Sequence, residues 1–179
     1  LVCPSGAITE SHRTTGDLYF GRAGGVQFVQ GLLNIGEVMS PPVISAVKAH
    51  APDVDLLIVD SPPGTSCPVI ESVRGADYVL LVTEPTPFGL NDLRLAVDMV
   101  RALAIPFGVI INRADVGDDE TQTYCRQENI EILAKIPDDR AVAEAYSRGE
   151  LASEAIPEYR AMFVQLLNDA VKEVAPSAG

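Results

Sequence analysis

The sequence predicts an α/β domain: an incomplete, doubly wound, mostly parallel sheet with helices on both faces. Three observations lead to this fold class. Short, almost continuously apolar runs recur along the chain, as in parallel strands that are covered on both faces. Segments with apolar residues at helical spacing separate these runs. Polar residues follow the runs, at the edge where such sheets bind ligands.

Composition limits the class of protein. The chain has 179 residues, 47% of them apolar, which is enough for one domain with a substantial core. No apolar run is long enough to span a bilayer. The net charge of −12 argues against a nucleic-acid partner, because phosphate contacts need clustered Lys and Arg. Three widely spaced cysteines indicate a reducing compartment, and we therefore expect a cytoplasmic protein.

The first elements expected are a hairpin and a helix. Residues 17–20 and 26–29 are rich in aromatic and β-branched side chains, and Gly24-Gly25 supplies the turn between them. A helix is expected from Pro41-Pro42 to about His50, because proline is tolerated in a first helical turn.

Four strands and two long helices are expected after residue 53. The strands cover residues 55–60, 78–83, 107–112 and 130–136. One helix carries apolar residues at helical spacing from Leu90 to Ala104, with Asn91 as its N-cap and Leu90 and Leu95 as its hydrophobic staple. The last helix, about 158–174, is expected to pack one apolar stripe on the sheet, formed by Tyr159, Met162, Phe163, Leu166, Leu167, Ala170, Val171 and Val174.

The first candidate site follows the strand expected at 55–60. Asp60 ends this strand, and Pro62-Pro63-Gly64 follows as a segment that is first stiff and then permissive. This layout delivers a carboxylate to a metal beside a phosphate, although Asp60 could instead cap a helix or a turn. Such an acid works opposite a phosphate loop of the form GxxxxGK[ST]. The chain has no such loop, because none of its lysines, Lys48, Lys135 and Lys172, follows a glycine.

Further candidates follow the next strands. Asn112 can donate to and accept from a base edge, and Asp115 can accept from an exocyclic amine. The alternative for Asn112 is a local turn that its own side chain stabilises. Pro137, Asp138 and Asp139 follow the strand that ends at Ile136, and either aspartate could simply cap the next helix.

Taken together, these residues resemble the MinD/ParA/Mrp branch of the P-loop ATPases, from about Asp53 to the C-terminus. The resemblance implies a nucleotide-binding fold from which the phosphate-loop strand is absent. The resemblance implies that Asp60 holds magnesium and positions the attacking water. It also implies that Pro62, Pro63 and Gly64 form the switch segment that senses the γ-phosphate. The matching loops are Thr83-Glu84-Pro85-Thr86 after the next strand, Asn112-Arg113-Ala114-Asp115 at the base, and Ile136-Pro137-Asp138 near the adenine.

The dipeptide Cys3-Pro4 points to one particular branch of this family. A cysteine followed by proline ends the bacterial ferredoxin motif C-x2-C-x2-C-x3-C-P. The chain therefore resembles the MinD-like ATPases with an inserted 4Fe-4S ferredoxin domain. Residues 1–10 would be the tail end of that insert, and residues 11–179 the C-terminal part of the nucleotide-binding domain. Cys3 would be an orphaned iron–sulfur ligand, unless Cys3-Pro4 is an ordinary turn.

The resemblance implies a fragment of an ATP-binding protein that couples nucleotide state to an iron–sulfur domain. ATP, magnesium and 4Fe-4S clusters would be cofactors of the full-length protein, and none is expected in this chain. The full-length protein would be an ATPase, whereas the chain alone is not expected to turn over ATP. Asp60 cannot replace the loop amides and the lysine that position the phosphates. A redox or iron–sulfur protein is the expected partner.

The missing strand has a structural consequence. In this family the phosphate-loop strand lies beside the strand that ends at Asp60, so two strand edges would lack a partner. We expect rearrangement or homodimerisation to close this gap.

Two other readings of the sequence stay open. The chain could be a non-catalytic binding or scaffold domain that kept the fold without the loop, with Asp60 and Asn112 in structural roles. It could also be a thiol enzyme that uses Cys67, for which neither His12 nor His50 is an evident base.

Overall fold

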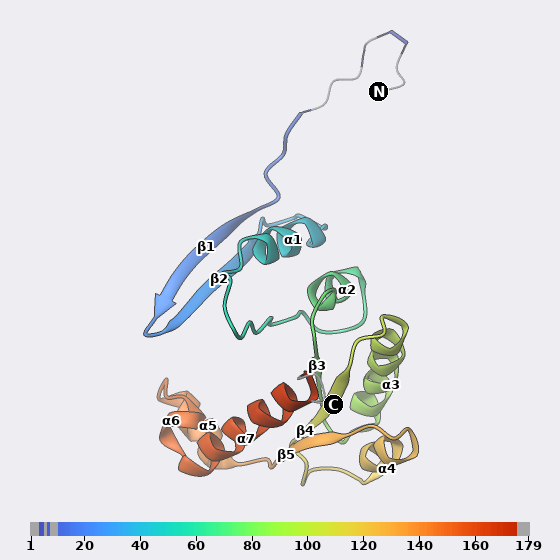
Figure 1. The fold of residues 1–179 in the computed structure, drawn as a ribbon, viewed down its shortest axis with the longest axis vertical. Helices are drawn as coiled ribbons and strands as arrows, with labels where there is room; N and C mark the ends of the chain where they lie inside the picture. Colours follow the sequence, from blue (N-terminus) through green and yellow to red (C-terminus); the bar gives the residue numbers. More distant parts are fainter. Residues whose placement is uncertain (1–3, 6, 8–10, 175–179) are drawn as a thin grey trace, which may run out of the picture. The chain divides into compact units, whose positions relative to one another are not determined.

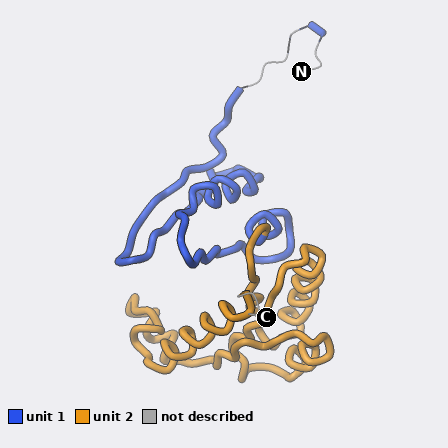
Figure 2. The backbone as a smooth tube through the Cα atoms, in the orientation of Figure 1, with its two compact units in different colours: residues 1–73 blue, residues 74–179 orange. Residues whose placement is uncertain are grey.

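A computed structural model describes residues 4–5, 7 and 11–174 of the chain. Cys3, the expected orphaned ligand, and most of the expected insert tail lie outside the described residues. The chain divides into two compact units, residues 1–73 and residues 74–179 (Figure 2). In the part of the chain that the structure describes, no helix is long and apolar enough to cross a membrane.

The first unit contains an antiparallel hairpin and two helices: β1 (Gly16–Ala23), β2 (Val26–Leu33), α1 (Pro41–Ala49) and α2 (Cys67–Val73). The predicted hairpin is confirmed, with strands longer than expected, and Gly24 turns the chain at a φ of 58°. Gly31 lets the hairpin approach α1, because a Cβ there would lie 2.5 Å from Cγ1 of Val43. The helix predicted from Pro41 is confirmed as α1.

Lys48 joins the two helices of the first unit. Its ammonium group donates to the carbonyl oxygens of Glu71 and Ser72, at 2.8 and 3.2 Å, in the last turn of α2. A cation in the last turn of a helix also interacts favourably with the helix dipole. Lys48 therefore has a structural role in holding α1 and α2 together.

The strand predicted over residues 55–60 is wrong. These residues have no strand structure, and Ile58 is 77% exposed. Strand structure requires a hydrogen-bonded neighbour, and none of the described strands pairs with this segment. The apolar run is present, but it has no partner to form a ladder with.

The second unit is a three-stranded parallel sheet in the order β3-β4-β5 (Figure 1). The strands are β3 (Val79–Thr83), β4 (Phe107–Asn112) and β5 (Ile132–Ile136), close to the predicted ranges. The helices are α3 (Pro87–Ala102), α4 (Glu120–Gln127), α5 (Arg140–Ser147), α6 (Ala152–Ala155) and α7 (Pro157–Val174). The predicted fold class, α/β with a parallel sheet, is confirmed.

The core of the second unit lies between β4, α3 and α4. Val109 and Ile111 of β4 are fully buried, and they pack with Leu93 and Val97 of α3 and with Cys125 of α4. Side chains alternate along a strand, so Gly108 and Ile110 lie on the other face of the sheet. The buried face predicted for α3 is confirmed for Leu90, Leu93, Val97 and Val100, whereas Ala104 is exposed and lies beyond the end of this helix.

The predicted start of α3 is wrong. The helix begins at Pro87, and Thr86 caps it by accepting a hydrogen bond from the backbone N–H of Gly89 at 3.0 Å. Asn91 lies inside the helix and Leu95 is 51% exposed, so neither has the predicted role. The Thr-Pro pair decides the boundary, because an extended threonine followed by proline at the first helical position is a strong helix start.

The prediction for the last helix is confirmed only in part. Tyr159, Leu166 and Ala170 of α7 are buried, and α7 packs on β5. The other members of the stripe keep more solvent contact, because the described sheet has only three strands to cover them. The exposed fractions are 38% for Phe163, 39% for Leu167, 49% for Val171 and 41% for Val174.

Candidate functional site

The carboxyl ends of β3, β4 and β5 meet at one edge of the sheet because the three strands are parallel. The loops that follow them contain Thr83 and Glu84, then Asn112 to Asp115, then Pro137 to Asp139. The structure therefore brings together the predicted site residues of the second unit: Asn112, Asp115, Pro137 and Asp138.

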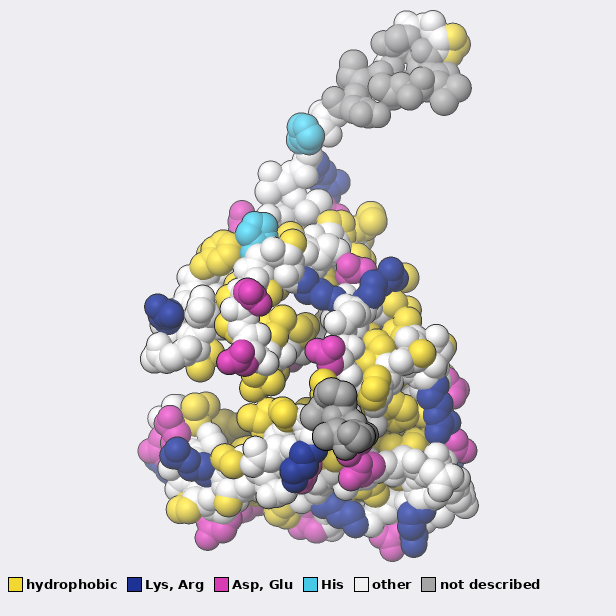
Figure 3. Space-filling model, in the orientation of Figure 1, with side chains coloured by type: hydrophobic (Ala, Val, Ile, Leu, Met, Phe, Trp, Pro, Cys, Tyr) yellow, Lys and Arg dark blue, Asp and Glu magenta, His cyan; other side chains and the backbone are white. Residues whose placement is uncertain are grey.

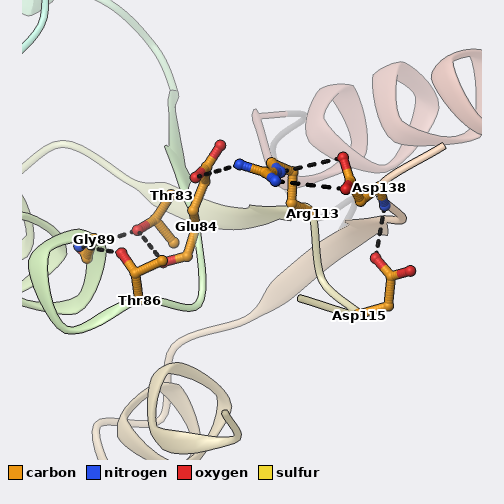
Figure 4. A network of polar contacts seen from close by, with 7 residues as sticks. All are labelled: Thr83, Glu84, Thr86, Gly89, Arg113, Asp115 and Asp138. Atoms are coloured by element: carbon orange, nitrogen blue, oxygen red, sulfur yellow. Dashed lines mark hydrogen bonds and ion pairs between the residues drawn. The ribbon is translucent and has the colours of Figure 1, made fainter. Parts of the chain in front are cut away.

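Arg113 connects all three loops (Figure 4). Its Nε donates to Oδ1 of Asp138 at 3.2 Å, and its Nη2 donates to Oδ2 at 3.5 Å. Its Nη1 lies 3.7 Å from Oε2 of Glu84, in the loop after β3. The hydrogen bond to Asp138, together with the charges of Asp138 and Glu84, raises the pKa of Arg113 above its ordinary value. Arg113 is therefore a permanent cation between two acids.

The backbone at Arg113 has an uncommon conformation. Its φ is 52°, in the left-handed region that a residue with a side chain rarely adopts. The turn is held by two hydrogen bonds, from the N–H of Ala114 to the carbonyl of Ile136 and from the N–H of Val116 to the carbonyl of Arg113, both at 2.9 Å. Such strain costs on the order of 1 kcal/mol and is found most often at functional sites.

The two aspartates after β5 have different roles. Asp139 is the N-cap of α5, because its Oδ1 accepts from the N–H of Ala141 at 2.8 Å. The sequence left open which of the two aspartates caps the next helix, and the structure shows that it is Asp139. The N–H of Asp138 donates to Oδ1 of Asp115 at 2.6 Å, which ties the loop after β5 to the loop after β4.

The loop after β3 is held equally firmly. The hydroxyl of Thr83 donates to the carbonyl of Gly89 at 2.9 Å. A Cβ on Gly117, whose φ is 123°, would lie 1.9 Å from the carbonyl oxygen of Pro85. The loops after β3 and β4 are therefore in backbone contact, and this contact requires a glycine. These contacts tie the loops after β3 and β4 to each other at the edge of the sheet.

Asn112, which ends β4, is half-buried. No hydrogen bond joins its side-chain amide to any other residue that the structure describes. An amide with an open donor and an open acceptor at this edge is available to a ligand. The sequence analysis places Arg113 and Glu84 in the matching loops but gives neither a role, although an arginine directly after a strand, with acids in the neighbouring loops, is a usable signal.

The other predicted site residues belong to the first unit. Asp60 is exposed, and Gly64 has a φ of 95°, the permissive conformation predicted for it. Leu57 to Pro63 line a cavity of about 710 Å³ together with residues of β2 and α1. Asp60, Pro62, Pro63 and Gly64 thus lie in one unit and Asn112, Asp115, Pro137 and Asp138 in the other.

The carboxylates and cysteines of the chain can be compared with the ligands that magnesium and a 4Fe-4S cluster require. Magnesium uses one or two carboxylates together with phosphate oxygens and water, and a single exposed Asp60 fits that pattern. The described residues contain no group of three or more His, Cys, Asp or Glu that could hold a metal by itself.

A 4Fe-4S cluster takes four cysteines, and the chain has three. Burial raises the pKa of Cys125, which lies in the core, so this cysteine does not fit a ligand role.

Cys67, the thiol of the third interpretation, is exposed at the start of α2. Within the described residues, neither His12 nor His50 is hydrogen-bonded to it; Nδ1 of His50 lies 2.8 Å from the carbonyl oxygen of Ala46. No side chain among the described residues is hydrogen-bonded to Cys67 as an activating base.

A parallel sheet covered by helices, with ordered polar loops at the carboxyl ends of its strands, defines the open α/β class of nucleotide-binding folds. The family model described as ParA, "NUBPL iron-transfer P-loop NTPase", matches residues 43–175. The chain belongs to this family, which confirms the resemblance to MinD/ParA/Mrp-type P-loop NTPases.

Similar proteins agree with this assignment. An uncharacterized protein of Methanocaldococcus jannaschii is 31% identical over 145 residues, which are 80% of this chain and 51% of that protein. A protein of Caenorhabditis briggsae named cytosolic Fe-S cluster assembly factor NUBP1 homolog is 30% identical over 127 residues, 59% of this chain and 41% of its own length. The chain thus spans about half the length of the curated relatives it matches.

A solved structure shares the fold. The MinD cell division protein of Aquifex aeolicus matches with a TM-score of 0.55 and 20% sequence identity, over 80% of this chain and 63% of that one. This likeness supports the MinD-like fold of the chain.

Proposed function

We propose that this chain is the C-terminal part of a MinD-like ATP-binding protein that couples its nucleotide state to an iron–sulfur, ferredoxin-type domain. The observation that carries the proposal is the ordered edge of the second unit, where Asn112 presents an open amide beside the fixed loop of Asp138. The family's description as iron-transfer NTPases supports the iron–sulfur part.

Each predicted residue has a role in this proposal. Asn112, Asp115, Pro137 and Asp138 form the base region. Pro62, Pro63 and Gly64 form the segment that senses the γ-phosphate. Asp60 holds magnesium and positions water, while bound magnesium would neutralise phosphate charge. Cys3 is an orphaned ligand of a 4Fe-4S cluster.

The proposed setting is a cytoplasmic homodimer that exchanges iron–sulfur clusters or electrons with a partner protein. The relative named as a cytosolic Fe-S cluster assembly factor supports both the compartment and the kind of partner.

Nucleotide binding can be tested on the protein at its full natural length. A fluorescent ATP analogue is titrated with Mg²⁺ into the wild type, Asn112→Ala and the control Asn168→Ala, which changes an exposed asparagine of α7. We expect Asn112→Ala to weaken binding about tenfold, because one amide that pairs with the base is lost. Asn168→Ala should bind like the wild type.

The alternative is a non-catalytic binding or scaffold domain that keeps the fold, with Asp60 and Asn112 in structural roles. Wild-type protein of full natural length that binds no nucleotide would support this alternative and contradict the proposal.

Catalysis needs a separate assay. The purified chain of 179 residues should not turn over ATP, because Asp60 alone does not provide a phosphate cradle. Clear turnover by this chain that disappears in Asp60→Ala would show the expectation to be wrong.

A further inference from the structure

The outer edge of β2 is unpaired in the first unit. Among the described strands, β2 pairs only with β1. In an antiparallel pair, the N–H and C=O groups of every second residue point toward the partner strand, and those of the other residues point away from it. The N–H of Asn34 donates to the carbonyl of Thr15 at 3.0 Å, which continues the ladder and fixes this alternation. The backbone groups of β2 that point away from β1 are therefore those of Gln27, Val29, Gly31 and Leu33.

The same four residues line the cavity of about 710 Å³ in the first unit. Every residue from Gln27 to Gly31 lines this cavity, and so does every residue from Leu57 to Pro63. The face of a sheet would contribute every second residue of a strand, whereas the edge of a strand contributes consecutive residues. The cavity is therefore lined by two stretches of backbone, and we call it the edge slot.

Apolar side chains form most of the edge slot. Val43, Ile44 and Val47 of α1 line it, and Lys48 and Asp60 are the only charged residues among those that do. Backbone N–H and C=O groups in such surroundings need a hydrogen-bond partner, because leaving them unpaired costs free energy. An extended peptide segment meets both conditions, because its backbone matches a row of groups two residues apart and its alternate side chains can be apolar.

The sequence of β2 is also suited to strand addition. Proteins protect exposed strand edges with charged residues and with proline. β1 contains Asp17 and Arg22, whereas β2 contains neither a charged residue nor a proline. An edge without such protection, in an apolar slot, favours a bound strand over exposure to water.

The relatives of this chain indicate a source for such a segment. The match to the protein of Methanocaldococcus jannaschii covers 80% of this chain but 51% of that protein, so about half of this relative lies outside the match. A segment of the same polypeptide also has a high effective concentration at the edge slot, which a separate peptide lacks.

We propose that the edge slot takes an extended segment of the same polypeptide, from the part of the natural protein outside these 179 residues. This segment adds a strand that hydrogen-bonds to Gln27, Val29, Gly31 and Leu33 of β2. It also gives the backbone of residues 57–60 the neighbour that it lacks among the described strands. The inference rests on one part of the proposed function, namely that this chain is the C-terminal part of a longer protein.

The first test is hydrogen exchange, followed by NMR in the protein at its full natural length. The hairpin contains its own control, because the N–H groups of Leu18 and Phe20 point away from β2 on the opposite edge. After correction for intrinsic rates, we expect the amides of Val29 and Gly31 to exchange about a hundredfold more slowly than those two, because only the row on β2 is in a second ladder. Equal protection of the two rows would overturn the inference.

The second test places proline on either edge of the hairpin. Gln27 and Arg22 are cross-strand neighbours, and the N–H of each points away from the other strand, so neither substitution removes a hydrogen bond between β1 and β2. We expect Gln27→Pro to lower the melting temperature by about 5 °C more than Arg22→Pro, because it removes a donor to the added strand. Equal shifts would contradict the inference.

The third test identifies the occupant. Gln27 is replaced by the photoreactive p-benzoylphenylalanine in an equal mixture of ¹⁵N-labelled and unlabelled protein, and cross-linked peptides are analysed by mass spectrometry. We expect cross-links within one chain, to a peptide outside these 179 residues. Cross-links between labelled and unlabelled chains would assign the edge slot to a second copy and overturn the inference, as would cross-links only within these 179 residues.

Failure of this inference and failure of the proposed function give different results. Equal exchange of the two rows in a protein that binds the ATP analogue would leave the proposed nucleotide binding intact. A protected β2 edge with the expected cross-link, in a protein that binds no nucleotide, would support the added strand and contradict the proposed nucleotide binding.

Discussion

Residues 54–59 and strand β4 have similar side chains and opposite environments. In the first unit, Val54, Leu56, Leu57, Ile58 and Val59 are each at least 41% exposed. In the second unit, Val109, Ile110 and Ile111 are at most 5% exposed. β4 has a hydrogen-bonded strand on each side and helices packed on it, whereas none of the described strands pairs with residues 54–59. Apolar composition alone therefore does not bury a segment; its neighbours do.

Exposed apolar side chains are not confined to that segment. Hydrophobic residues reach the surface of both units (Figure 3). In the second unit they include Leu80 and Val82 of β3, which is an edge strand of the three-stranded sheet. The sequence predicts a gap between two open strand edges, one of them at residues 55–60, and because those residues form no strand this expectation is not confirmed. Homodimerisation as the way to close that gap stays a prediction.

The largest expected difference comes from one substitution made in both regions. Ile111→Ala removes a fully buried side chain and should cost about 2–5 kcal/mol of unfolding free energy, because the core cannot fill the cavity. Ile58→Ala removes a side chain that is 77% exposed and should cost less than about 0.5 kcal/mol. Urea denaturation measures both values.

A large cost for Ile58→Ala would break this comparison. It would mean that residues 54–59 are covered in solution, and light scattering would then show whether a second copy of the chain covers them.

Two glycines sharpen the comparison. Gly117→Ala should cost about 3 kcal/mol, because its φ is 123° and the new Cβ would lie 1.9 Å from the carbonyl oxygen of Pro85. Gly64→Ala has a φ of 95° but nothing within 4 Å of the new Cβ, so only the backbone strain of about 1 kcal/mol remains. Thermal denaturation of the two variants tests the order. Equal costs would show that the contact between the loops after β3 and β4 does not add to stability.

The smallest effect concerns pH and involves Tyr78, which directly precedes β3. Burial raises the pKa of Tyr78 to about 12, and the charges of Glu131 and Glu173 contribute. The unfolded chain loses this proton near pH 10 and the folded chain keeps it, so the stabilising contribution is present below pH 10 and is lost between about pH 10 and 12.

The measurement is the melting temperature across that range. The wild type should lose melting temperature more steeply than Tyr78→Phe, which has no phenol to ionise. Tyr19→Phe, a change on the exposed hairpin of the first unit, should follow the wild type. Parallel curves for the wild type and Tyr78→Phe would contradict the prediction.

Local sequence signals were enough for most elements. Gly24-Gly25 located the hairpin turn, Pro41 the start of α1, and three apolar runs the strands of the parallel sheet. The start of α3 is also encoded locally, in Thr86-Pro87, whereas the predicted cap Asn91 lies inside the helix. The positions of Asn112, Asp115 and Asp138 at one edge followed from their places after parallel strands, because such strands end on the same side.

The sequence by itself determined the fold class, the order of most elements and the residues that collect at the carboxyl edge of the sheet, because these depend on periodicity and on turn chemistry within a few residues. Only the tertiary structure decided that residues 55–60 pair with none of the described strands, and that Arg113 reaches Asp138, 25 positions away in the sequence, and Glu84. A strand and an ion pair both need a second group that the fold brings near, and local sequence does not specify that group.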